Sequence, residues 1–327
     1  MAADTGAPLL HIEGLKTHFY TDDGIARAVD GVDIKIHRGE TVGIVGESGC
    51  GKTVTAMTVL KLIAMPPGRI VAGRILWQGR DLVPLTSQQL DDIRSKEIAI
   101  VFQEPMTSLN PVYTIGDQLM EVLLRHEGLN RKQARERVME LLSLVQIANP
   151  QRRIDDYPHQ FSGGMRQRVM IAMALACNPK LLIADEPTTA LDVTIQAQIL
   201  ELMAGLKEKF GMAIMLITHA MGVVAEVTQR VVVMYAGKVV EEAPVEVLFE
   251  TPRHPYTQGL IRSIPRIDRS ATHRARLEAI GGTVPSILNL PVGCRFADRC
   301  KFAMPECRAA EPPLREVAPG HKVACIL

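Results

Sequence analysis

The 327-residue sequence contains no apolar run that approaches the roughly 20 residues a membrane-spanning helix requires. It also has almost no net charge, because 37 Lys and Arg residues are balanced by 36 Asp and Glu residues. Nothing global therefore attracts the protein to nucleic acid or to an anionic membrane. Residues 1–10 lack the charged start and apolar stretch of a signal peptide. We expect a cytoplasmic chain that reaches any membrane through a partner.

Internal repeats and low-complexity tracts are absent as well, and 47% hydrophobic with 22% charged residues is typical of a globular chain with a sizeable core. The length suggests two domains. After Glu242 the composition shifts to an irregular stretch punctuated by proline. We therefore predict a larger domain over residues 1–249 and a small irregular, cysteine-containing domain over residues 250–327.

Short apolar runs alternate with helical patterns, which predicts an α/β fold with a mostly parallel sheet. Residues 24–37 are interpreted as an antiparallel strand pair that precedes this sheet. Residues 114–145 have helical periodicity and predict an inserted helical subdomain. The predicted strands of the sheet are residues 41–45, 98–102, 181–184, 213–217 and 230–234.

A glycine-rich stretch lies between the strand at 41–45 and a helical pattern at 54–63. Its sequence is Gly46-Glu47-Ser48-Gly49-Cys50-Gly51-Lys52-Thr53. In loops of this pattern, backbone N–H groups hold nucleotide phosphates, the lysine reaches the β- and γ-phosphates, and the hydroxyl binds Mg²⁺. We assign these side-chain roles to Lys52 and Thr53. A chance glycine turn is the ordinary alternative, and the flanking strand and helix argue against it.

Polar residues end three of the predicted strands, at the sheet edge where parallel sheets bind ligands. Asp185 and Glu186 follow the strand at 181–184, so Asp185 would hold Mg²⁺ and Glu186 would orient or deprotonate the attacking water. Gln103 and His219 end two other strands at the same edge. A charged strand end is often merely solvated, and a lone histidine is more often structural.

A second glycine turn, Ser162-Gly163-Gly164, opens a helical pattern upstream of the strand at 181–184. The unpaired N–H groups of such a helix start form an anion site. The chain thus carries two phosphate-binding loops, although one nucleotide needs only one.

Four of the six cysteines crowd the C-terminal end: Cys294, Cys300, Cys307 and Cys325. In a reducing cytoplasm such a cluster indicates metal ligands before disulfides. Four thiolates suit tetrahedral Zn²⁺ or an iron–sulfur cluster. The absence of a Cys-x2-Cys pair weakens the zinc interpretation.

Residues 9–245 resemble the nucleotide-binding domain of ATP-binding-cassette (ABC) transporters, with every motif in chain order. The resemblance implies an ABC-type P-loop NTPase: a RecA-like, mostly parallel sheet, an N-terminal antiparallel β part and a helical subdomain at about 105–160. It implies these site residues: Lys52 and Thr53 (Walker A), Gln103 (Q-loop), Ser162, Gly163 and Gly164 (signature), Asp185 and Glu186 (Walker B), Asp192 (D-loop), His219 (switch) and Phe19 (adenine platform), with Thr53, Gln103 and Asp185 on Mg²⁺.

Family geometry also explains the second loop, because the signature of one domain caps the ATP bound by another in a head-to-tail dimer. A second ABC ATPase subunit, identical or paralogous, is therefore expected. Binding energy at such a shared site becomes domain movement.

Residues 101–111, 161–168 and the His-Pro-Tyr-Thr stretch at 254–257 further resemble ATP-binding subunits of oligopeptide/dipeptide importers. One departure is Ala220, where the family usually has an acidic residue. The resemblance implies two transmembrane permease subunits, an indirect extracytoplasmic binding protein, a peripheral position on the cytoplasmic side of the inner membrane, and a 4Fe–4S cluster, favoured over zinc, on the four cysteines. The rival interpretations are a soluble ABC ATPase acting on ribosomes or DNA, and an exporter subunit.

Overall fold

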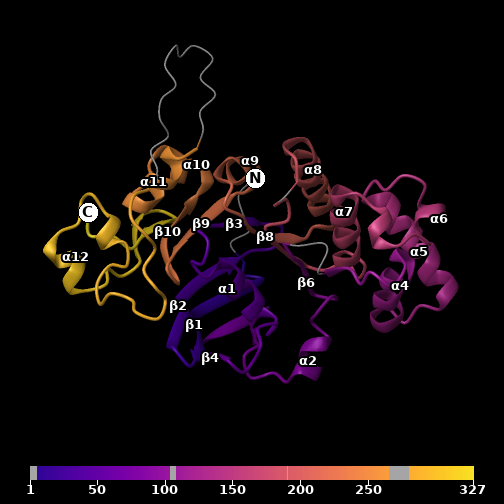
Figure 1. The fold of residues 1–327 in the computed structure, drawn as a ribbon, viewed down its shortest axis with the longest axis horizontal. Helices are drawn as coiled ribbons and strands as arrows, with labels where there is room; N and C mark the ends of the chain where they lie inside the picture. The colour runs from indigo at the N-terminus through magenta and orange to yellow at the C-terminus, as the bar shows by residue number, and fades with distance from the viewer. Residues whose placement is uncertain (1–5, 104–107, 190, 265–279) are drawn as a thin grey trace, which may run out of the picture. The chain divides into compact units, whose positions relative to one another are not determined.

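The structure is a computed structural model that describes residues 6–103, 108–189, 191–264 and 280–327. The chain forms two compact units whose segments alternate along the sequence (Figure 1). Unit 1 comprises residues 1–6, 37–40 and 84–217, and unit 2 comprises residues 7–36, 41–83 and 218–327. Within the described residues, no helix is both long and apolar enough to cross a bilayer.

Unit 1 contains three parallel strands whose central member, β7, pairs with β6 on one side and β8 on the other. Strands buried on both faces read as continuous apolar runs, and every residue of β7 and β8 is buried. This confirms the strands predicted from those runs. The strands are β6 (Ile98–Val101), β7 (Leu181–Asp185) and β8 (Ala213–Ile217), and the longer helices beside them are α7 (Gly163–Ala174) and α8 (Val193–Phe210).

The predicted helical pattern at 114–145 consists of two helices of unit 1, α4 (Ile115–His126) and α5 (Arg131–Leu144). Each begins where a polar side chain accepts a hydrogen bond from an unpaired N–H of the first turn. Thr114 accepts from the Asp117 N–H at 3.1 Å, and Asn130 accepts from the Gln133 N–H at 3.0 Å. Shorter elements complete this part of the chain: α2 (Ser87–Asp91), α6 (Pro150–Arg153) and the 3-10 turn η1 (Pro158–Gln160).

Unit 2 contains an antiparallel sheet in the order β2-β1-β4-β5. The predicted strand pair within residues 24–37 is wrong, because this segment is one continuous strand, β2, that pairs with β1. The hairpin turn lies just before the segment, where Thr21 faces Gly24 across the two strands. The strands are β1 (Leu10–Thr21), β2 (Gly24–Ile36), β4 (Gly68–Trp77) and β5 (Arg80–Asp81).

The predicted strands at 41–45 and 230–234 also belong to unit 2, where β3 (Thr41–Val45) pairs in parallel with β9 (Arg230–Tyr235). Helix α1 (Lys52–Val59) follows β3 and is shorter than the predicted helical run at 54–63. It ends before Lys61, whose φ of 49° lies in the left-handed region and cannot continue a right-handed helix. Helix α9 (Met221–Val227) completes this part of the unit.

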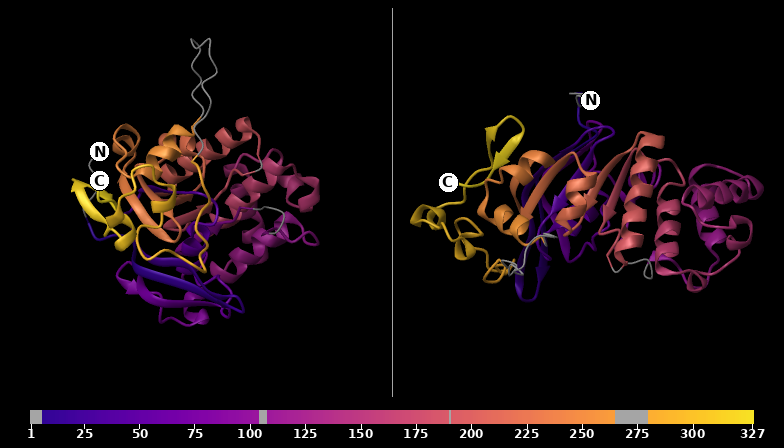
Figure 2. Two further views of the ribbon diagram at one scale, coloured as in Figure 1. Left: turned by 60° about the vertical axis from the view of Figure 1, so that its left-hand side comes forward. Right: turned by 90° about the horizontal axis from the view of Figure 1, so that it is seen from above.

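The C-terminal segment, by which we mean residues 250–327, adds regular structure to unit 2, although its prolines predict an irregular chain. Strand β10 (Lys238–Pro244) pairs with β9 and with β12 (His321–Val323), and β12 pairs with β11 (Arg315–Ala318). Figure 2 shows this segment in orange and yellow. The remaining elements are α10 (Val245–Glu250), α11 (Pro255–Arg262), the 3-10 turn η2 (Ala297–Arg299) and α12 (Pro305–Ala309).

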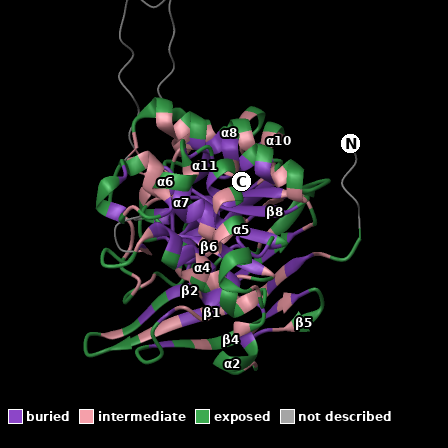
Figure 3. Ribbon diagram, turned by 90° about the vertical axis from the view of Figure 1, so that its right-hand side faces the viewer, coloured by how far each residue is buried: buried purple, intermediate pink, exposed green. Residues whose placement is uncertain are grey.

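An aromatic cluster packs the C-terminal segment onto the rest of unit 2. The ring of Tyr235 on β9 lies 4.7 Å from that of Tyr256 and 5.3 Å from that of Phe296, measured between centroids. All three residues are buried, and Figure 3 shows buried residues along other strands such as β8. Tyr256 and Phe296 therefore share a core with β9. The domain boundary that the sequence predicts between residues 249 and 250 stays a prediction.

Charged groups are also buried at this junction. The Glu241 carboxylate, on β10, accepts hydrogen bonds from the backbone N–H groups of Arg253 and His254 at 2.7 and 2.9 Å and lies 2.7 Å from Nε2 of His321. His254 in turn caps α11, because its Nδ1 accepts the N–H of Tyr256 at 3.1 Å. A ring nitrogen can accept this bond only when it carries no proton.

We expect acid to destabilise the fold through His254. Burial lowers the pKa of His254 from its ordinary value to about 4. Between pH 6.5 and pH 4, His254 binds a proton in the unfolded chain but stays neutral in the folded chain. The contribution of His254 to the free energy of unfolding is therefore fully present above pH 6.5 and is lost as the pH falls to 4. The loss amounts to about 3 kcal/mol at most. Chemical denaturation of the wild type and His254→Asn across this range measures it.

The asparagine variant keeps a capping oxygen and cannot titrate, so its unfolding free energy should depend less steeply on pH. His159→Asn, which alters an exposed histidine, serves as the control and should follow the wild type. Identical pH slopes for the wild type and His254→Asn would contradict the prediction.

Candidate nucleotide-binding site

The loop between β3 and α1 is built from glycines in conformations that other residues avoid. Gly46, Gly49 and Gly51 have φ values of 149°, 77° and 100°. A Cβ on Gly46 would lie 2.2 Å from the Met234 carbonyl oxygen, and one on Gly51 would lie 2.4 Å from that of Ala28. No side chain fits at these two positions. The loop consequently lies flush against β9 and β2, with its backbone N–H groups at the start of a helix.

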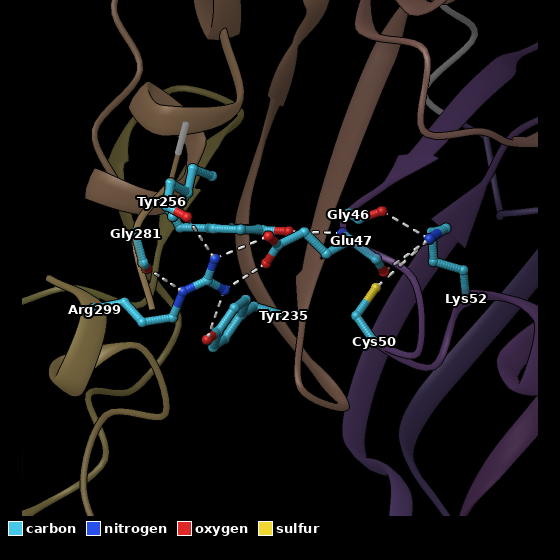
Figure 4. A network of polar contacts seen from close by, with 9 residues as sticks. Gly46, Glu47, Cys50, Lys52, Tyr235, Tyr256, Gly281 and Arg299 are labelled. Atoms are coloured by element: carbon cyan, nitrogen blue, oxygen red, sulfur yellow. Dashed lines mark hydrogen bonds and ion pairs between the residues drawn. The ribbon is translucent and has the colours of Figure 1, made fainter. Parts of the chain in front are cut away.

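Lys52 curls back over this loop, as Figure 4 shows. Its Nζ donates to the carbonyl oxygens of Gly46 at 2.7 Å and Glu47 at 3.1 Å. Lys52 is buried against the loop, so its side chain places a cationic group within the loop itself. Three of the other residues assigned to phosphate or Mg²⁺, Ser48, Gly49 and Thr53, are exposed.

Cys50 has a structural position in the same loop. Its side chain is buried, and burial raises the pKa of its thiol. A protonated, enclosed thiol is a poor nucleophile and a poor metal ligand. Its backbone carbonyl accepts the Gly237 N–H at 2.9 Å, which ties the loop to the β9–β10 turn. Any contact between Cys50 and phosphate is therefore made through its backbone.

In unit 1, the structure brings Gln103 and Glu186 together. Gln103 follows β6, and its Nε2 donates to Oε2 of Glu186 at 3.1 Å. Thr189 Oγ1 donates to the same oxygen at 2.9 Å. Glu186 has a φ of 47°, a left-handed conformation that turns the chain sharply after Asp185, the buried last residue of β7. Two donors thus orient this carboxylate at the carboxyl edge of the parallel strands.

Sequence reasoning missed Thr189 as a partner of Glu186. A hydroxyl three residues after a carboxylate, directly beyond a strand, is the signal that would have found it, because one turn brings residues i and i+3 together.

The second glycine turn begins α7, as predicted. Ser162 caps this helix by accepting the N–H of Met165 at 3.3 Å. A Cβ on Gly164 would lie 2.7 Å from Cγ2 of Ile195, so the glycine allows the start of α7 to lie against the start of α8. Asp192 caps α8 by accepting the Ile195 N–H at 3.0 Å. Unit 1 therefore presents two adjacent helix N-termini, each with an exposed capping residue.

Two other predicted residues lie in unit 2. His219 is exposed in the loop between β8 and α9, and the preceding Thr218 donates its N–H to the Ile44 carbonyl at 3.2 Å, which holds this loop at the end of β3. Phe19 is half-buried on β1, opposite Gly68 on β4. Residues 104–107, within the stretch shared with peptide importers and at the start of the predicted helical subdomain, and Ala190 of the D-loop lie outside the described residues.

The prediction of a 4Fe–4S cluster, or of zinc, on the C-terminal cysteines is wrong. In the described part of the chain, no group of three or more His, Cys, Asp or Glu side chains is placed to hold a metal ion. Burial raises the pKa of the Cys294 and Cys300 thiols, which disfavours the thiolate form that a metal requires. The Cys307 sulfur instead accepts the Met304 N–H at 3.5 Å at the start of α12, a local contact that gives this side chain a structural role.

The glycine loop, the parallel strands and the oriented carboxylate define an ATP-binding cassette. The family model described as "ABC transporter" matches residues 29–189, and the one described as "Oligopeptide/dipeptide transporter, C-terminal region" matches residues 240–307. A solved chain, the dimeric ATP-binding cassette MJ0796 in a post-hydrolysis state bound to ADP and Pi, is similar with a TM-score of 0.65 and 28% identity, over 72% of this chain and 98% of that one.

Curated relatives resemble nearly the whole chain. The oligopeptide transport ATP-binding protein AppD of Bacillus subtilis is 52% identical, over 98% of this chain and 96% of AppD. The dipeptide transport ATP-binding protein DppD of Escherichia coli is 48% identical, over 97% and 96%. This chain therefore belongs to the peptide-transporter branch of the ABC ATP-binding proteins, and it is an ATP-binding ATPase.

Two glycines of this loop, Gly51 packed against backbone and Gly49 with open space beside it, predict different effects of the same substitution. Gly51→Ala should lower the free energy of unfolding by more than about 2 kcal/mol, because its Cβ would lie 2.4 Å from a backbone oxygen. Gly49→Ala shares the left-handed φ but has nothing within 4 Å of its Cβ, so it should cost about 1 kcal/mol. Urea denaturation of both variants checks this, and equal losses would rule out the steric explanation.

Proposed function

We propose that this chain is the ATP-hydrolysing subunit of an importer of peptides. The observation that carries the proposal is the Glu186 carboxylate, held by Gln103 and Thr189 at the edge of the parallel strands, in a chain that also has a complete glycine loop ending in Lys52. The printed names of its relatives, which are peptide-transport ATP-binding proteins, support peptides as the cargo. They give no support to a role on ribosomes or DNA.

The chemistry of this chain suits a Mg²⁺-bound triphosphate. The exposed residues Ser48, Gly49 and Thr53 surround the loop N–H groups, and Lys52 supplies the positive charge. Thr53, Gln103 and Asp185 offer the hydroxyl, amide and carboxylate oxygens that Mg²⁺ prefers. When bound, the ion neutralises charge on the phosphate oxygens. We assign the adenine contact to Phe19.

Glu186 orients and activates the attacking water, and Gln103 and Thr189 fix the carboxylate in position for this task. His219, exposed beyond the end of β8, contacts the γ-phosphate. Ser162, Gly163, Gly164 and Asp192 contact the ATP held by a second ABC subunit, and the adjacent starts of α7 and α8 suit that anion.

Two such subunits work beneath two transmembrane permease subunits, on the cytoplasmic side of the membrane. The segment near residues 103–110 is the proposed contact with the permease. An extracytoplasmic binding protein delivers the cargo and meets this chain only indirectly. The pair closes around two ATP molecules and reopens after hydrolysis, which converts the chemical step into movement of the permease.

Replacing the catalytic carboxylate should separate ATP binding from ATP hydrolysis. Glu186→Gln keeps an oxygen that accepts the hydrogen bonds of Gln103 and Thr189 but removes the base, so kcat should fall by at least about 100-fold. The affinity for ATP should stay within about threefold of the wild type. Steady-state hydrolysis and equilibrium ATP binding measure the two effects. The control is Glu201→Gln, at an exposed position of α8. Hydrolysis at the wild-type rate by Glu186→Gln would remove Glu186 from this role.

The proposed position at the membrane is tested by identifying the proteins that co-purify with this chain. We expect the tagged chain, expressed in its own cells and extracted with mild detergent, to co-purify with permease subunits encoded beside it. Mass spectrometry of the complex also gives the number of each subunit. Recovery with ribosomes or DNA instead of membrane proteins would reject the importer proposal and leave the ATPase assignment intact.

A further inference from the structure

The phosphate-binding loop contains a negatively charged residue, which is an unfavourable neighbour for a nucleotide. Glu47 is the second residue of the loop, and its carboxylate belongs to unit 2 together with the C-terminal segment. The guanidinium of Arg299 donates two hydrogen bonds to this carboxylate, from Nη1 to Oε2 at 2.6 Å and from Nη2 to Oε1 at 2.9 Å (Figure 4). The two residues are 252 positions apart in the sequence.

Arg299 is itself locked in place. Its side chain is only 4% exposed, and its Nε donates to the Gly281 carbonyl at 2.8 Å. Nη1 donates to the Tyr235 hydroxyl at 3.2 Å, and the guanidinium carbon lies 5.7 Å from the centre of the same ring. Hydrogen bonding to Glu47 raises the pKa of Arg299 above its ordinary value, so the charge is permanent. A planar, two-pronged donor held in this way sets both the charge and the orientation of its partner.

A second contact from the C-terminal segment holds the backbone of the same loop residue. The Tyr256 hydroxyl accepts the Glu47 N–H at 2.7 Å. Tyr256 is fully buried near the start of α11, where Pro255 opens the helix and His254 caps it. The His-Pro-Tyr sequence therefore delivers one hydroxyl to the phosphate-binding loop.

We propose that Arg299 and Tyr256 are positioning residues of the ATP site: Arg299 neutralises the Glu47 carboxylate, which would otherwise repel the phosphates, and Tyr256 fixes the loop backbone. The inference rests on the proposed phosphate-binding role of residues 46–53. It gives the C-terminal segment a share in nucleotide affinity. Because coupling is reciprocal, bound ATP should also stabilise the packing of that segment.

The charge argument is tested in the full-length chain by equilibrium binding of ATP with Mg²⁺, using Arg299→Met, Glu47→Gln and the double variant. Methionine keeps an unbranched stem against the aromatic rings and removes the charge. Arg299→Met should weaken ATP binding roughly threefold to tenfold, the cost of one unpaired charge within the phosphate-binding loop. The loss should appear in the dissociation constant and KM more than in kcat, and 0.5 M KCl should shrink it.

The double variant Glu47→Gln/Arg299→Met decides between charge and packing. If neutralisation is the role of Arg299, removing the carboxylate as well should restore affinity to within about twofold of the wild type. Arg308→Met is the matched control, because it breaks an exposed ion pair with Asp298 in the same segment and should leave ATP binding unchanged. A double variant as weak as Arg299→Met, or wild-type affinity in Arg299→Met, would overturn the inference about charge.

Tyr256→Phe tests the backbone contact separately. It removes only the hydroxyl, and we expect ATP binding to weaken about twofold to fivefold with little salt dependence. Wild-type affinity in this variant would overturn the role of Tyr256.

Lys52→Ala distinguishes failure of this inference from failure of the proposed function. Weak ATP binding by Lys52→Ala together with normal binding by Arg299→Met would reject the inference alone. Normal binding by Lys52→Ala would reject the phosphate-binding role of the loop itself.

Discussion

The absence of space for side chains in the loop between β3 and α1 is the constraint on which the nucleotide site depends. At Gly46 and Gly51 the backbone lies against carbonyl oxygens of β9 and β2, and a single Cβ would force these segments apart. Close approach of the backbone requires glycine at these positions, and it places the loop N–H groups at the start of α1. It also allows Lys52 to fold back onto the loop's own carbonyls. The shape of this loop is therefore set by packed backbone.

Buried polar and charged side chains link the C-terminal segment to the rest of unit 2, and each has a specific partner. Arg299 binds Glu47, Arg295 binds Asp30, and His321 meets Glu241. Burial acts to raise the pKa of Asp30, but its hydrogen bond to Arg295 and the charge of that residue outweigh this effect and hold the pKa at about 2. Breaking one such pair leaves an uncompensated buried charge, which is costly. The pairs thus specify one arrangement of the segment.

Sequence reasoning succeeded where the signal is local. Glycines at fixed spacing between a strand and a helix located the tight loop between β3 and α1, and the buried run ending in Asp185 located the end of β7. It failed at residues 24–37, where one strand pairs with an earlier segment, and at the four cysteines, where spacing alone indicated metal. Whether Cys294 and its neighbours are available as thiolates depends on burial, which the order of residues does not reveal.

The sequence by itself determined the ATP-binding cassette, because its motifs are short and each acts through backbone geometry next to its own strand or helix. Only the tertiary structure decided which distant groups complete those motifs. Gln103 reaches Glu186 from the end of another strand, and Arg299 and Tyr256 converge on Glu47. Such partners are separated by as many as 252 positions and share no pattern. Parallel pairing of β6 with β7 brings Gln103 to Glu186, and packing of the aromatic cluster brings Tyr256 and Arg299 to Glu47, so these contacts follow from the fold.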